Sequence, residues 1–251
     1  QTLAEMNLDE KKHNPRGVLS MISAAKNELI GPEQYPAHDY RAEIVRRIYA
    51  RYDELLLQCN ARDFDDLLTH TVYLFRAHEA VLERYQRRYE HILVDEFQDT
   101  NMAQYELVKQ LAGERRNLFA VGDPDQSIYA FRGADYRNVM RFRDDYPDSR
   151  MILLEQNYRS HQAILDAATG VIDQNPGRVK KQLFSERKEG PLVTIFEAHN
   201  EEDEARYIVE TITDLVNYAG YEPGDFAVMY RTNAQSRALE EGLLRAGLSY
   251  R

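Results

Sequence analysis

Five short apolar runs, each ending in polar residues, constrain the fold more than any other feature of this sequence. They are HILV (91–94), NLFAV (117–121), RMILL (150–154), LVTIF (192–196) and FAVMY (226–230). Each run has the length of a strand, and each is followed by polar residues and then by a helical pattern. This rhythm is typical of a parallel sheet whose strands are joined by helices. The sequence therefore predicts an α/β fold after residue 90.

The first 90 residues predict helices and no strand within the first sixty. Apolar side chains recur at three- and four-residue spacing between Ile44 and Leu56, and a second run extends from Leu67 to Leu82. Such spacing places the apolar side chains on one face of a helix. The segments NPRG and IGPEQYP contain helix breakers and mark loops.

Two acidic runs are interpreted as helix starts and not as metal sites. EEDE (201–204) opens the clearest helical pattern, residues 201–219, where negative charge complements the helix dipole. DFDDLL (63–68) begins with Asp63, a residue type that caps helix N-termini. The seven histidines are scattered without a metal-ligand spacing, so zinc is not expected.

The composition indicates in which compartment the protein is found and how it could bind nucleic acid. The 251 residues are 43% hydrophobic, with no apolar stretch long enough to span a membrane, so no membrane partner is expected. A single cysteine, Cys59, allows no intrachain disulfide and favours a reducing, cytoplasmic compartment. The net charge of −10 argues against nucleic-acid binding by bulk electrostatics and leaves stacking and local patches. The basic pairs Arg87–Arg88 and Lys180–Lys181 are interpreted as solvated surface.

The ends of the predicted strands carry the polar residues that suggest chemistry. Four of them read DEFQD, GDPDQSIY, EQNYRS and RTNAQSR. Parallel sheets bind ligands at the carboxyl ends of their strands. The first end resembles a Walker B element, in which Asp95 would hold Mg²⁺ and Glu96 would activate the attacking water. No lysine follows a glycine, so the Gly-Lys-Ser/Thr loop that cradles phosphates in such sites does not occur among these residues.

Four motifs in order, VDEFQDTN, AVGDPDQSIYAFRGAD, LLEQNYRS and VMYRTNAQSR, closely resemble the UvrD/PcrA/Rep group of superfamily 1 DNA helicases. The resemblance implies parts of two RecA-like parallel-sheet motor domains with an all-helical insertion. We expect residues 1–62 to belong to the insertion, 63–150 to the first RecA-like domain and 151–251 to the second. Because this family places its phosphate loop earlier and its last motor motifs later, the chain is expected to be an internal piece of a helicase that is inactive alone.

The resemblance also implies roles for residues of the nucleotide site. Asp95 would coordinate Mg²⁺, and Glu96 would be the general base for attack on the γ-phosphate of ATP. Gln126 resembles the sensor of the γ-phosphate. Tyr158 would stack on the adenine, and Arg159 would act as an arginine finger from the second motor domain.

On the DNA side, the resemblance implies contacts from Tyr129, Phe131 and Arg132, and from Arg231 and Asn233. Stacking of bases on aromatic rings tolerates any sequence, which suits single-stranded DNA. Phe131 stands where close relatives often have tryptophan. The implied partners are single-stranded DNA, single/double-strand junctions and the remaining parts of the same protein, with 3′ to 5′ polarity in repair or replication.

Two alternatives remain open at this point. The chain could be a non-catalytic module that binds single-stranded DNA or a repair partner. It could also be a fragment of a helicase-nuclease whose nuclease lies outside these residues.

Overall fold

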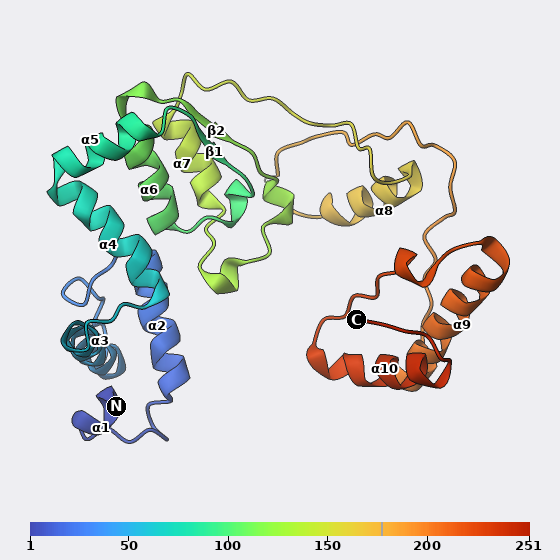
Figure 1. Cartoon of the computed structure of the whole chain (residues 1–251), viewed down its shortest axis with the longest axis horizontal. Coiled ribbons are helices and arrows are strands. Elements are labelled where there is room, and N and C mark those ends of the chain that lie inside the picture. Colours follow the sequence, from blue (N-terminus) through green and yellow to red (C-terminus); the bar gives the residue numbers. More distant parts are fainter. Residues whose placement is uncertain (177) are drawn as a thin grey trace. The chain divides into compact units, whose positions relative to one another are not determined.

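The computed structural model describes residues 1–176 and 178–251, and the side chain of Arg132 also lies outside the description (Figure 1). The chain divides into two compact units, each of which is described by itself. Unit 1 comprises residues 1–156 and 169–184, and unit 2 comprises residues 157–168 and 185–251.

Unit 1 holds most of the helices and the sheet. Its helices and strands are α1 (Thr2–Glu5), α2 (Pro15–Asn27), α3 (Tyr40–Gln58), α4 (Phe64–Ala77), α5 (Glu79–Arg88), β1 (Ile92–Val94), α6 (Met102–Ala112), β2 (Leu118–Ala120) and α7 (Arg137–Asp145). Short 3₁₀ turns join them: η1 (Phe97–Asp99), η2 (Gly113–Arg115), η3 (Pro124–Gln126) and η4 (Ala130–Arg132).

Unit 2 is built around two helices, α9 (Glu201–Ala219) and α10 (Ser236–Arg245), with turns η5 (Pro223–Asp225) and η6 (Asn233–Gln235). Helix α8 (Gln162–Ile172) has residues in both units. The helix predicted over residues 201–219 is confirmed, with its four acidic residues in the first turn and Asn200 as N-cap. None of the described helices has both the length and the apolar character needed to cross a bilayer.

Capping residues define the helices of the N-terminal region. Asn14 caps α2, with proline at the first helical position, and Asp39 caps α3. The predicted helix over residues 44–56 is confirmed within α3. The run from Leu67 to Leu82 is helical but interrupted at His78, which ends α4 and precedes α5.

A hydrophobic core holds α1, α2 and α3 together. Its buried members are Leu3, Val18, Ile22, Ala25, Ile44, Ile48 and Tyr49. The members from α3, Ile44, Ile48 and Tyr49, follow the three- and four-residue spacing seen in the sequence, so they bury one apolar face of that helix against α1 and α2.

The first two predicted strands form a parallel pair. Ile92 of β1 lies opposite Leu118 of β2, and Val94 lies opposite Ala120. Helix α6 lies in the connection between them, as a parallel pair requires. The predicted α/β fold with a parallel sheet is therefore confirmed.

The other three predicted strands, residues 150–154, 192–196 and 226–230, are not strands in the described structure. Ile195 and Met229 are almost fully exposed, at 92% and 93%. Near these runs the structure has an isolated parallel bridge between Gln156 and Phe184. A strand exists through hydrogen bonds to a neighbouring strand, so an apolar run predicts the capacity to pair and not the presence of a partner.

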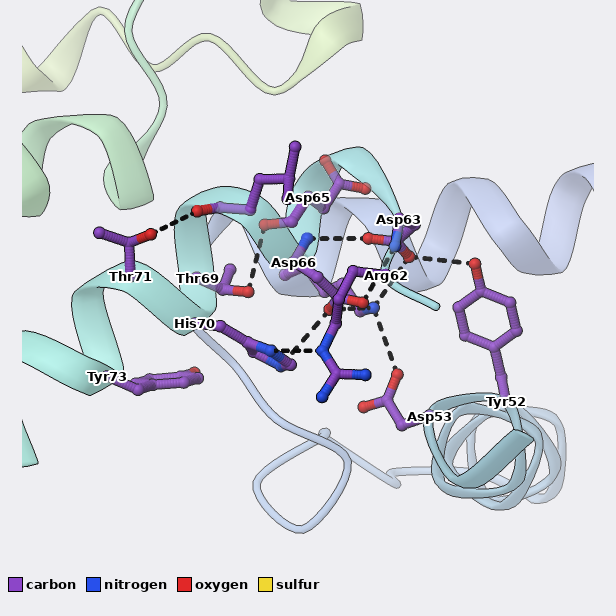
Figure 2. Close-up of polar contacts among 12 residues, drawn as sticks. Tyr52, Asp53, Arg62, Asp63, Asp65, Asp66, Thr69, His70, Thr71 and Tyr73 are labelled. Carbon is purple, nitrogen blue, oxygen red and sulfur yellow. Dashed lines mark hydrogen bonds and ion pairs between the residues drawn. The ribbon is translucent and has the colours of Figure 1, made fainter. Parts of the chain in front are cut away.

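Among the described residues, the most heavily buried charged side chain is Lys26, at the end of α2. Its Nζ lies 2.6 Å from Asp66 Oδ1, 2.9 Å from Asp63 Oδ2 and 3.2 Å from Asp53 Oδ1. Figure 2 shows Asp53, Asp63 and Asp66, with the Tyr52 hydroxyl donating to Asp63. The cluster joins α2 to α3 and α4.

Asp63 therefore has two functions in the fold. As predicted, it starts a helix: its side chain accepts from the backbone N–H of Asp66, and Asp66 reciprocates in a capping box. It also accepts a hydrogen bond from Lys26, which the sequence did not indicate.

Ionisation of the cluster depends on the balance of burial and pairing. Burial opposes the charged form of Lys26, but hydrogen bonds to Asp66 and Asp63 outweigh it and raise its pKa above the ordinary value. Burial likewise opposes ionisation of Asp63, but the hydrogen bonds from Lys26, from the backbone of Asp66 and from Tyr52, together with the charge of Lys26, outweigh it and lower the pKa of Asp63. Burial raises the pKa of Asp53, the most distant of the three carboxylates.

Replacing Lys26 by methionine should lower the free energy of unfolding by about 3 kcal/mol, because three carboxylates would lose their common partner. Chemical denaturation followed by circular dichroism measures the change. Lys12→Met, at an exposed position, is the matched control and should have little effect. Equal stability of the two variants would contradict the role of Lys26 in the fold.

Candidate nucleotide site

The acidic residues that follow β1 lie in a tight turn. Glu96 has a left-handed backbone conformation, φ 49° and ψ 43°, which is uncommon for a residue with a side chain. The carboxylate of Asp95 accepts a hydrogen bond of 2.9 Å from the backbone N–H of Glu96. Both side chains are exposed. The turn thus ends the strand and leaves two adjacent carboxylates accessible.

Gln98 connects this turn to the end of the neighbouring strand. It is 1% exposed, and its Nε2 donates to Glu96 Oε2 at 2.8 Å. Its Oε1 accepts from the backbone N–H of Asp123 at 2.9 Å. One buried amide therefore holds the two strand ends together, satisfying a donor on one side and an acceptor on the other.

Gly122 makes this approach possible. A Cβ at this position would lie 2.5 Å from Gln98 Oε1 and 3.0 Å from the backbone nitrogen of Phe97. Any side chain would therefore force the two loops apart.

The turn after β2 is organised by Asp123. Its carboxylate accepts from the backbone N–H of Asp125 at 3.0 Å, as expected for turn chemistry, and from Gln126 Nε2 at 2.9 Å. Through Gln98 and Asp123, Gln126 is connected to Glu96 by three consecutive hydrogen bonds. The structure thus brings together Asp95, Glu96 and Gln126, which come from two different motifs.

Two basic residues cover the other side of this turn. Arg178 pairs with Asp125 at 2.8 Å, and Lys181 pairs with Asp123 and with Asp125. Burial opposes ionisation of both aspartates, but pairing outweighs it. Hydrogen bonds from Lys181 and Gln126 lower the pKa of Asp123, and hydrogen bonds from Arg178 and Lys181 lower the pKa of Asp125. The interpretation of Lys181 as solvated surface is wrong, because its side chain is only 15% exposed and is paired with two carboxylates.

A pocket of about 390 Å³ lies at the carboxyl end of β1. Its polar lining comes from Asp95, Glu96, Asp99, Thr100 and Gln104. Asp99 Oδ1 is buried there without a hydrogen-bond partner in the described structure. A buried oxygen of this kind is expected to meet a ligand or water.

The pocket fits Mg²⁺ by donor chemistry. Its carboxylate oxygens are hard ligands, and Mg²⁺ is usually held by one or two carboxylates together with water and substrate phosphates. The described residues include no group of three or more side chains arranged as a complete metal site. Asp95 is suited to supply one ligand, in a set completed by phosphate and water.

Two aromatic side chains predicted to contact DNA lie close together in unit 1. The ring centroids of Tyr129 and Phe131 are 6.0 Å apart at 49°, and the two residues are 36% and 75% exposed. The segment ends at Gly133, whose φ of 88° favours glycine. The side chain of Arg132, also predicted to contact DNA, lies outside the described residues.

Unit 2 presents Tyr158 and Arg159 in a turn before α8. Asn157 Oδ1 accepts from the backbone N–H groups of Arg159 and Ser160, at 3.0 and 2.8 Å, and so fixes the turn. Arg187 donates to the backbone carbonyl of Arg159 at 3.0 Å. The side chains of Tyr158 and Arg159 are exposed.

Arg231 and Asn233 lie in a second turn of unit 2, and both are exposed. Gln235 Oε1 accepts from the backbone N–H groups of Arg231 and Thr232, at 3.0 and 2.9 Å. The roles of these two residues, and of Tyr158 and Arg159, stay predictions, since each unit is described by itself.

The sequence indicated the catalytic-type residues but missed Gln98. A glutamine inside a polar run gives no sign that it is the buried one. The available signal was its position, two residues after a strand-ending Asp-Glu pair and opposite a glycine that follows the next strand.

A parallel strand pair, with an acidic turn after one strand and a glutamine turn after the other, is the arrangement of an α/β domain that binds its ligand at the carboxyl ends of the strands. Two family models match the chain: the UvrD/REP helicase N-terminal domain over residues 1–147, and the UvrD-like helicase C-terminal domain over residues 152–251. The chain belongs to the UvrD/Rep helicase family.

Three relatives illustrate the similarity. PcrA of Bacillus subtilis (strain 168) is 49% identical over 250 residues, 99% of this chain. PcrA of Leuconostoc citreum is 45% identical over 252 residues, 100% of this chain, and UvrD1 of Mycobacterium tuberculosis is 48% identical over 259 residues, 98% of this chain. Each is named an ATP-dependent DNA helicase, and this chain spans 34% of the length of each.

Replacing Gln98 by methionine should lower the free energy of unfolding by about 1–3 kcal/mol, because the backbone N–H of Asp123 and the carboxylate of Glu96 would lose their partner. Denaturant titration measures the loss. Gln58→Met, at the exposed end of α3, is the matched control. A Gln98 variant as stable as this control would show that the bridge does not hold the strand ends together.

Proposed function

We propose that this chain supplies the carboxylate side of the ATP-hydrolysing site of a DNA helicase, together with a surface for single-stranded DNA. The observation that carries the proposal is the Gln98 bridge, which joins Asp95 and Glu96 to the Gln126 turn at one edge of the sheet. The names of the relatives, ATP-dependent DNA helicases, support the choice of reaction.

Asp95 and Glu96 have distinct roles in this proposal. Asp95 holds Mg²⁺, which when bound neutralises charge on the phosphates of ATP. Glu96 accepts the proton of the attacking water. The left-handed turn at Glu96 supports this division, since it separates two adjacent carboxylates and leaves both accessible.

Gln126 is the proposed sensor of the γ-phosphate. Its amide donates to Asp123, which also binds Lys181, so a phosphate oxygen would compete with Asp123 for the same donor. The conformation of the turn after β2 would then depend on whether Gln126 donates to Asp123 or to the γ-phosphate.

Tyr158 and Arg159 complete the proposed nucleotide site from the second motor domain. Tyr158 stacks on the adenine, and Arg159 stabilises charge on the γ-phosphate as an arginine finger, a contribution of about 10³ to 10⁵ in rate. The turn fixed by Asn157 supports a defined placement of both side chains.

On the DNA side, we propose that bases stack on Tyr129 and Phe131, while Arg132, Arg231 and Asn233 contact the strand. The proposed substrates are single-stranded DNA and its junctions with duplex, with 3′ to 5′ movement in repair or replication. The remaining parts of the same protein are the proposed partners, and a cytoplasmic location is consistent with the single cysteine.

A second candidate function is binding of single-stranded DNA without catalysis. The exposed pair of aromatic rings, 6.0 Å apart, favours it independently of the nucleotide site.

Glu96→Gln in the complete protein that carries this chain should lower the DNA-stimulated ATPase rate by about 10²- to 10⁴-fold, because the water loses its general base. A coupled phosphate-release assay measures the rate. Glu114→Gln, at an exposed position in η2, should retain activity. Near-normal hydrolysis by the Glu96 variant would remove the proposed role of this residue.

Phe131→Ala should weaken binding of a fluorescent oligothymidine by about 1 to 3 kcal/mol, the contribution of one stacked base. Fluorescence anisotropy measures the dissociation constant. Phe64→Ala, which removes a phenylalanine that is 90% exposed elsewhere in unit 1, serves as control. If both variants bind like the wild type, the aromatic pair is not the DNA surface.

A further inference from the structure

Helix α2 ends in two buried polar residues, Lys26 and Asn27, which contact different parts of unit 1. Lys26 is held by Asp53 of α3 and Asp66 of α4. This pairing fixes the end of the helix from which Asn27 projects.

Asn27 contacts the residue that opens the helix after the nucleotide turn. Its Oδ1 accepts a hydrogen bond of 2.6 Å from Asn101 Nδ2, and the two residues are 8% and 7% exposed. Asn101 is the N-cap of α6 and accepts from the backbone N–H of Gln104 through Oδ1. The residues from Asp95 to Thr100 lie directly before it, so Asn27 holds the far end of the acidic turn.

The same side chain packs against the segment that carries the aromatic pair. At Gly133, a Cβ would lie 3.0 Å from Asn27 Nδ2 and 3.3 Å from its Cγ. Gly133 lies two residues after Phe131 and four after Tyr129, and the backbone N–H of Ala134 donates to the carbonyl of Tyr129 at 3.3 Å. Movement of this loop would therefore press Gly133 on Asn27.

Hydrogen bonds beside Asn27 connect the same two segments. The carbonyl of Thr100 accepts from the backbone N–H of Asp135 at 3.0 Å and from Asn138 Nδ2 at 2.9 Å. Asp135 and Asn138 are buried. Because these contacts are closely packed, a displacement on one side is passed to the other and not absorbed by empty space.

We propose that Asn27 is a positioning residue that couples DNA binding at the Tyr129–Phe131 loop to the acidic turn of the nucleotide site. Stacking of a base shifts the loop, Gly133 moves against the Asn27 amide, and the Asn27–Asn101 hydrogen bond carries the shift to the start of α6. The inference rests on the proposed function and adds to it a residue that belongs to none of the four sequence motifs.

The test uses the complete protein and compares Asn27→Ala with Asn101→Asp. The first removes the acceptor for Asn101. The second keeps the N-cap acceptor for Gln104 but replaces the donor that faces Asn27 by an oxygen. Ser20→Ala, at an exposed position on α2, is the matched control. ATPase rates are measured with and without oligothymidine, oligothymidine affinity by anisotropy, and folding by thermal denaturation.

Both variants should reduce the stimulation of the ATPase by DNA about fivefold or more, the usual range for coupling between two sites, while the rate without DNA stays close to that of Ser20→Ala. The double variant should lose little more than either single variant, since both break one link. Undiminished stimulation in folded variants, or an equal loss of the rates with and without DNA, overturns the inference. Absence of stimulation in the wild type instead overturns the proposed function itself.

Discussion

The side-chain amide of Gln98 is the contact on which the candidate site depends. Hydrogen bonds between parallel strands fix the spacing of their backbones, but the loops that follow the strands have no such bonds. Gln98 supplies the missing connection by donating to Glu96 and accepting from the backbone of Asp123. Because the amide is buried, water cannot replace either partner, and the loops keep their relative position. Gln126 takes its place in the site through the same connection.

In the helical region, a buried ion cluster fixes how the helices are joined. Lys26 lies among Asp53, Asp63 and Asp66, and such a group tolerates little rearrangement, because the buried ammonium loses a partner whenever a carboxylate moves away. The neighbouring core of α1, α2 and α3 is apolar, and apolar contacts have no fixed direction. The ion cluster thus specifies how α4 joins these helices, while the core provides most of the burial.

The sequence predicts what depends on local pattern. Helix α9 and the cap at Asp63 follow from periodicity and capping chemistry, and the first strand pair follows from two apolar runs with a helix between them. Asp95, Glu96 and Gln126 follow from motif resemblance, and the structure brings these three together.

What the sequence could not predict depends on partners distant along the chain. The runs at 150–154, 192–196 and 226–230 have strand character, but whether a strand forms depends on a neighbour to receive its hydrogen bonds. Lys181 was interpreted as surface because its partners, Asp123 and Asp125, lie more than fifty residues earlier in the sequence. The basic pair itself gives no sign of them. Gln98 and Asn27 were missed for the same reason, since both act through residues outside their own segment.

Gly122 has no side chain, and this determines the distance between the loops that follow β1 and β2. The Oε1 atom of Gln98 lies 2.5 Å from the place where a β-carbon would be, so the two loops approach each other more closely than a side chain would allow. Even a methyl group would widen that gap, and the reach between a carboxylate on one loop and an amide on the other would change with it. The absence of a side chain at Gly122 thus sets how closely the two loops of the candidate site approach each other.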